Sequence, residues 1–163
     1  MGAAAHYGFW RASSRVMADL IDTLNDLIAT CMDSEEGFGK AAKGVHSDNL
    51  RHRFTGIARQ RAEFADELAE EVRRMGAAPA AAGHQSGIQH RGWRELETSI
   101  RPKGDSDFLA DCELGEENTL RHYEHALTRE LPAEVRSVVE RHRLAVQEAL
   151  LELRELEQVR KAG

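Results

Sequence analysis

Four long stretches of this 163-residue chain carry apolar residues at spacings of three and four, the period of a helix buried along one face. The stretches cover residues 13–45, 48–75, 106–129 and 132–160. The chain has only three prolines, and Pro132 stands where a helix begins and a missing N–H costs nothing. The pattern therefore predicts an all-α protein in which four long helices share one core.

The lengths of the links between these stretches predict how the helices are connected. A few residues join the first stretch to the second and the third to the fourth, which is typical of antiparallel hairpins. The middle link is long and contains a short amphipathic stretch over residues 86–100, where Trp93 is expected to anchor it to the bundle. Such a link suits a crossover along the bundle. We therefore expect an up-down-down-up four-helix bundle over residues 13–163, after an irregular tail at 1–12 that hangs free or docks on a groove.

Composition and charge narrow the classes of function. The formal net charge of −6 argues against a general phosphate-binding surface, so no nucleic-acid partner is expected. No apolar run approaches the ~20 residues needed to span a bilayer, so no membrane partner is expected. Cys31 and Cys112 lie on apolar helix faces and are interpreted as small buried side chains in a reducing compartment. These features predict a cytoplasmic protein.

Each long helix carries one charged or polar residue within its apolar stripe: Glu35, Arg61, Glu116 and His142. At about 1.5 Å of rise per residue, the up-down-down-up order brings all four to a similar height. In an up-down-up-down bundle, Glu116 would fall nearer the opposite end. The four positions therefore support the crossover, and they predict a buried polar layer within the core.

One function for such a layer is metal binding. A dinuclear site in a helical bundle takes a Glu from each of two helices and a Glu-x-x-His from each of the other two. Glu35 and Glu116 fit the first requirement, but Val139 stands three residues before His142, where a Glu is needed. Arg61 stays protonated and cannot bind a cation. A single iron or zinc ion on Glu35, Glu116 and His142 is the metal alternative that remains.

The preferred interpretation of the layer is an ion-pair network. Arg61 can bridge Glu35 and Glu116 with paired N–H donors, and Tyr123 and His142 can complete the hydrogen bonding. Buried charges are tolerated when they are paired. On this interpretation no cofactor is expected.

The chain also resembles a known family. The resemblance lies in seven ordered stretches: residues 24–28 (LNDLI), 33–38 (DSEEGF), 61–68 (RAEFADEL), 90–93 (HRGW), 112–117 (CELGEE), 123–127 (YEHAL) and 131–132 (LP). Together they are similar to a bacterial family of ferritin-like four-helix-bundle domains of unknown function, and the similarity covers about residues 20–156. The resemblance implies a ferritin-like fold with a short extra helix in the crossover. It implies no established activity.

These observations are compatible with two functions. The first is a non-enzymatic structural or interaction protein that forms a homo-oligomer or binds a protein partner, with Tyr7, Phe9 and Trp10 as a candidate apolar contact. The second is a ferritin-like metal-binding or redox protein of the stress response that uses the three candidate metal ligands. The sequence contains no complete catalytic or dinuclear ligand set, so we favour the first and expect no enzymatic activity.

Overall fold

The computed structural model describes residues 13–81, Trp93 and residues 102–163, and its regular elements within these parts are all helices. The helices are α1 (Ser14–Gly44), α2 (Asp48–Arg74), α4 (Asp105–Leu127) and α5 (Ala133–Ala162). Their bounds differ from the predicted stretches by at most two residues. The predicted tail at 1–12 and, apart from Trp93, the predicted crossover helix at 86–100 lie outside the described residues. None of the described helices is long and apolar enough to cross a bilayer.

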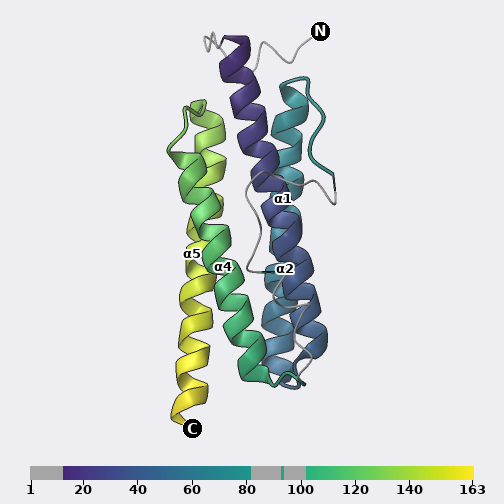
Figure 1. The fold of residues 1–163 in the computed structure, drawn as a ribbon, viewed down its shortest axis with the longest axis vertical. Coiled ribbons are helices and arrows are strands. Elements are labelled where there is room, and N and C mark those ends of the chain that lie inside the picture. Colours follow the sequence, from purple (N-terminus) through teal and green to yellow (C-terminus); the bar gives the residue numbers. More distant parts are fainter. Residues whose placement is uncertain (1–12, 82–92, 94–101) are drawn as a thin grey trace.

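The directions of the four helices confirm the predicted connectivity. α1 and α2 run antiparallel, α4 runs parallel to α2, and α5 turns back beside α4 (Figure 1). α1 packs against α2 and α4, and α5 packs against α4 and less closely against α2. The four helices therefore surround one core, with every neighbouring pair antiparallel, as the up-down-down-up order requires.

The buried apolar side chains form two clusters along the bundle. One includes Leu24, Leu68 and Val139, and the other includes Phe54 and Leu153. On each helix, the residues of one cluster give way to those of the other close to the position predicted for the polar layer, which is Glu35, Arg61, Glu116 or His142. The polar layer therefore lies at the junction of the two apolar clusters.

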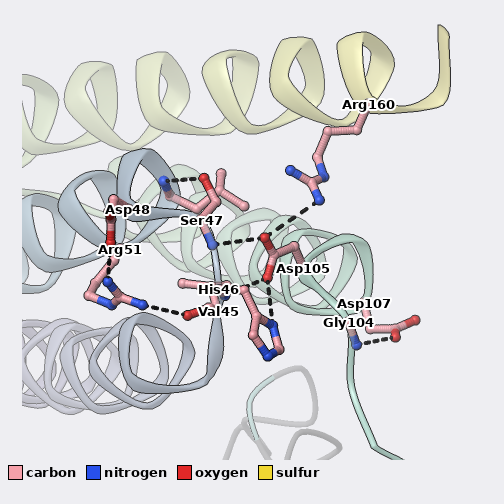
Figure 2. Close-up of polar contacts among 10 residues, drawn as sticks. Val45, His46, Ser47, Asp48, Arg51, Gly104, Asp105, Asp107 and Arg160 are labelled. Carbon is pink, nitrogen blue, oxygen red and sulfur yellow. Dashed lines mark hydrogen bonds and ion pairs between the residues drawn. The ribbon is translucent and has the colours of Figure 1, made fainter. Parts of the chain in front are cut away.

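Asp105 ties three elements together at the end of the bundle where α1 meets α2. Its carboxylate accepts hydrogen bonds from the backbone N–H groups of His46 at 2.7 Å and Ser47 at 3.0 Å, and it lies 3.5 Å from Nη2 of Arg160 on α5 (Figure 2). The hydrogen bond from the His46 backbone and these other contacts hold the pKa of Asp105 below its usual value. One carboxylate at the start of α4 thus joins the α1–α2 turn to the end of α5.

Trp93 fills the seam between α1 and α4. Its side chain is buried, and it makes an edge contact with the ring of Phe38, with 5.1 Å between the ring centroids. A Cβ atom added to Gly37 on α1 would lie 1.9 Å from the indole, and one added to Gly115 on α4 would lie 2.3 Å from it. Glycine at these two positions therefore makes room for the indole, and Trp93 itself packs against the bundle as expected.

α2 and α5, on the opposite side of the bundle, are less closely packed and leave a groove of about 330 Å³. The groove is lined mostly by small and polar residues of the two helices, with one larger apolar residue, Ile57: His52, Arg53, Gly56, Ile57, Gln60, Ala145, Glu148, Ala149 and Glu152. An ion pair between Arg53 and Glu152 joins its two walls. This is the open side of the bundle, and the α1–α4 seam is its closed side.

Candidate functional site

A fully buried ion pair occupies the centre of the bundle. Nη2 of Arg61, on α2, donates a hydrogen bond to Oε1 of Glu116, on α4, and neither side chain is exposed. Nη1 of Arg61 donates to Oε1 of the neighbouring Gln60 at 2.6 Å. Burial raises the pKa of Glu116, and the Arg61 charge acts in the opposite direction. The carboxylate therefore depends on the guanidinium for its charge to be tolerated.

A second group of polar side chains forms a chain of hydrogen bonds with one residue from each helix. The Cys31 Sγ on α1 lies 3.0 Å from the hydroxyl of Tyr123 on α4. That hydroxyl lies 3.2 Å from Nδ1 of His142 on α5, and Nε2 of His142 lies 2.8 Å from Oε2 of Glu67 on α2. Glu67 also forms an ion pair with Arg141. The chain thus runs from a buried thiol to a carboxylate at the surface.

The direction of each hydrogen bond follows from the charge states. Although burial raises it, hydrogen bonds from Arg141 and His142 lower the pKa of Glu67 overall, so Glu67 is an ionised acceptor. Burial lowers the pKa of His142, which favours the neutral ring. Nε2 must then carry the single N–H that is donated to Glu67, and Nδ1 must accept from the hydroxyl of Tyr123. The remaining donor for the tyrosine oxygen is the S–H of Cys31.

The two polar groups meet at the ring of Phe64. The guanidinium carbon of Arg61 lies 5.4 Å from the centroid of this ring, and the imidazole of His142 stacks on it with 3.8 Å between centroids. Burial raises the pKa of the Cys31 thiol to about 11 and the pKa of Tyr123 well above its usual value. The interior therefore holds one ion pair beside a chain of neutral groups, Cys31, Tyr123 and His142, that ends at the ionised Glu67.

The prediction that Glu35 belongs to the buried layer is wrong, because this side chain is exposed on α1. Ser34 is the inward residue instead, and it lies close enough to Glu116 to lower the pKa of that carboxyl. Its Oγ and Oε2 of Glu116 nevertheless have no hydrogen-bond partner of good geometry within the described parts. Packing of Trp93 against Gly37 centres the buried face of α1 on the side of Ser34, which turns Glu35 outward.

The three candidate metal ligands are therefore not brought together. Glu116 and His142 are fully buried, whereas Glu35 faces outward, and Arg61 pairs with Glu116 alone rather than bridging two carboxylates. Within residues 13–81, 93 and 102–163, no group of three His, Cys, Asp or Glu side chains is arranged to hold a metal ion. Tyr123 and His142 lie in the core as the sequence predicts, and they bond to each other rather than to Arg61.

Two members of the hydrogen-bond chain were missed by sequence reasoning. Glu67 follows Phe64 by three residues, which places its long side chain at the edge of the buried face of α2. This spacing was the sequence signal that Glu67 could reach the core. The signal is weak, because side chains at the edge of a buried helix face also commonly point to solvent. Cys31 is buried as predicted, and its thiol also bonds to Tyr123, a pairing that depends on how α1 and α4 are aligned.

Comparison with known proteins supports the architecture. The model of the family described as Domain of unknown function (DUF2383) matches residues 19–129. No curated protein matches the chain.

Among the solved structures that are similar to this chain, three share 14% sequence identity with it. A point mutant of Mycobacterium smegmatis Dps1 has a TM-score of 0.75, with 90% of this chain and 99% of that chain covered. The tetragonal form of M. smegmatis Dps has a TM-score of 0.76, with 90% and 91% covered. A C-terminal deletion mutant of M. smegmatis Dps has a TM-score of 0.71, with 84% and 96% covered. At this identity the similarity shows the fold alone, and it confirms the predicted ferritin-like four-helix bundle.

Proposed function

The chain belongs to the DUF2383 family, and from this premise we propose that it is a non-enzymatic helical bundle that acts by associating with a second copy of itself. The contact surface in this proposal is the outer face of α5 together with the groove beside it. The predicted contact at Tyr7, Phe9 and Trp10 lies outside the described residues.

The interior of the bundle favours a structural role. Helical bundles that hold metals project carboxylates and histidines into the core. Here the guanidinium of Arg61 lies fully buried against Glu116, and a guanidinium repels cations. The layer therefore joins α2 to α4, and among the residues that the structure describes it offers a metal no matched set of ligands.

The observation that carries the proposal is an exposed apolar stripe on α5. Leu144 is 50% exposed, Leu151 is 51% exposed and Val159 is 71% exposed. Their spacings of seven and eight residues place the three side chains on one face of the helix. Large apolar side chains aligned in this way on a helix surface are typical of helix–helix contacts between chains.

The groove beside this stripe supports a second copy as the partner. Glu148, which lines the groove, lies one turn from both Leu144 and Leu151, so the stripe and the groove adjoin. The groove is lined by small residues, including Gly56 and Ala149, with basic side chains on the α2 wall and acidic ones on the α5 wall. In a two-fold dimer, each copy can place its stripe against the groove of the other, and charges of opposite sign can face each other.

The test is the mass of the protein in solution, measured by light scattering after gel filtration and by sedimentation over a range of concentrations. We expect a dimer for the natural chain and a monomer for the double variant Leu144→Glu with Leu151→Glu. The matched control is Ala18→Glu with Ala110→Glu, which adds the same charge at exposed positions of α1 and α4, away from the stripe and the groove, and should remain dimeric. A natural chain that is monomeric at every concentration would overturn the proposal.

A further inference from the structure

The hydrogen-bond chain through the four helices has chemistry that self-association does not use. Its central member, Tyr123, is fully buried, and its hydroxyl touches a thiol on one side and an imidazole on the other. A phenol loses an electron more easily when a neighbouring base can take the phenolic proton.

His142 meets the requirements for that base. Its Nδ1 lies 3.2 Å from the phenolic oxygen, and Nδ1 is the unprotonated nitrogen because Nε2 donates to Glu67. A proton can therefore move from Tyr123 to His142 along an existing hydrogen bond. The imidazolium that results is stabilised by the Glu67 carboxylate at 2.8 Å.

The surroundings disfavour both stepwise routes to oxidation, in which either the proton or the electron leaves first. Burial raises the pKa of Tyr123 well above its usual value, so the phenolate is not formed first. Loss of an electron without loss of the proton would leave a cation in a buried site, which is costly. The charged and titratable groups around the pair are Cys31 from α1, Arg61 and Glu67 from α2, Glu116 from α4 and Arg141 from α5.

We propose that Tyr123 is a redox-active tyrosine that gives one electron to an oxidising metal complex of high potential while its phenolic proton moves to Nδ1 of His142. The O–H bond of Tyr123 breaks and an N–H bond forms on His142. The products are a neutral tyrosyl radical, an imidazolium paired with Glu67 and the oxidant reduced by one electron. Return of an electron to Tyr123 returns the proton. The S–H of Cys31 donates to the tyrosine oxygen throughout.

The experiment is flash oxidation by photogenerated ruthenium(III) tris-bipyridine, followed by electron paramagnetic resonance of the frozen sample. The chain has two tyrosines, so Tyr7→Phe leaves Tyr123 as the single tyrosine. Ring-deuterated tyrosine then distinguishes a tyrosyl signal from a tryptophan radical, because deuteration narrows the tyrosyl signal alone. We expect a tyrosyl radical in this variant and none when Tyr123→Phe is added. Absence of a tyrosyl radical from the first variant would overturn the proposal.

The role of His142 is tested by the pH profile of the oxidation rate. With His142 as the base, the rate is independent of pH wherever this histidine is neutral. In His142→Gln, water must take the proton, so we expect at least a tenfold slower oxidation at neutral pH and a rate that rises with pH. An unchanged rate and pH profile in His142→Gln would overturn the proposal.

A second variant keeps the test decisive if His142→Gln does not fold. Glu67 is 36% exposed, so Glu67→Gln leaves the core packing in place while it removes the charge beside Nε2. We expect a slower oxidation of Tyr123 in this variant. The control is Glu63→Gln, an exposed position on the same helix, which should leave the rate unchanged. Equal rates in the two variants would count against the proposed proton transfer.

Discussion

The closed and open sides of the bundle use the same residue type to opposite effect. On the closed side, the indole of Trp93 occupies the space beside Gly37 and Gly115. On the open side, the position of a Cβ on Gly56 has no neighbouring atom within 4 Å, and Gly56 lines the groove. Glycine thus lets an aromatic ring pack closely against the helices on the closed side, and it leaves a groove on the open side. The difference lies in what packs against the helix.

The polar layer connects these two sides. Arg61 extends from α2, on the open side, to Glu116 on α4, on the closed side. The hydrogen bond between Glu67 and His142 joins α2 to α5 as well. The apolar core is sealed where α1 meets α4, whereas the contact of α2 with α5 depends more on paired polar groups.

The largest effect is expected from breaking the buried ion pair. Arg61→Met leaves the Glu116 carboxylate unpaired in the core, and we expect the free energy of unfolding to fall by about 3–5 kcal/mol. Replacing both residues with Met removes both charges, so the double variant should be far more stable than either single one. Urea denaturation of the three variants measures this. A harmless Arg61→Met would show that the pair does not bind the two sides together.

The closed side should respond strongly to one added methyl group. In Gly37→Ala the new Cβ would overlap the indole of Trp93, and overpacking of this kind costs about 1–3 kcal/mol. The control is Gly39→Ala on the same helix, where a Cβ meets nothing within 4 Å, so a small gain in stability is expected. Thermal and urea denaturation of the pair compare the two positions. Equal stability in the two variants would mean that the indole does not fill this seam in solution.

The folded chain should lose stability as the pH falls, because burial disfavours the charged form of His142. The pKa of His142 is lower in the folded chain than its ordinary value of 6.5, so the unfolded chain binds more protons between these two values. The free energy of unfolding should therefore fall as the pH drops below about 6.5, and each pKa unit of difference corresponds to about 1.4 kcal/mol.

The control for this pH dependence is His142→Gln, which should lose the decline below the histidine value. A further decline at lower pH should persist in the variant, because the pKa of Asp105 is also lowered and the stability that it contributes is lost as the pH falls through its folded value. Urea denaturation at a series of pH values measures both. The pH dependence of the free energy of unfolding should differ between the natural chain and His142→Gln at pH values above those at which carboxylates titrate. The same dependence in both proteins would rule out His142 as its cause.

The smallest effect is expected on the open side. Gly56→Ala places a methyl group in open space and removes the flexibility of a helical glycine, so we expect a gain of about 0.5–1 kcal/mol. The measurement is urea denaturation of the dilute protein, where the monomer is favoured. A loss of stability would contradict the open groove, and a loss confined to high concentration would indicate that a second copy fills it.

The fold was predictable because it rests on features that are local in the sequence. The period of the apolar residues sets the four helices, and the short and long links set their order. Burial of Arg61, Glu116, Tyr123 and His142 also followed, because each lies well inside the apolar stripe of its helix.

Tertiary structure decided which polar groups meet. A helical turn has 3.6 residues, so the residues three and four positions after Cys31 lie near the same helix face. The spacing from Cys31 therefore allowed either Ser34 or Glu35 to face inward. The packing of Trp93 against Gly37 selected Ser34. The partners of His142 likewise depend on the rotation and axial position of α2, α4 and α5, which no single helix encodes. The sequence by itself therefore determined the helices, their order and most of the buried polar positions. The pairing among these groups arose only when four helices met, because it depends on side-chain reach across the core.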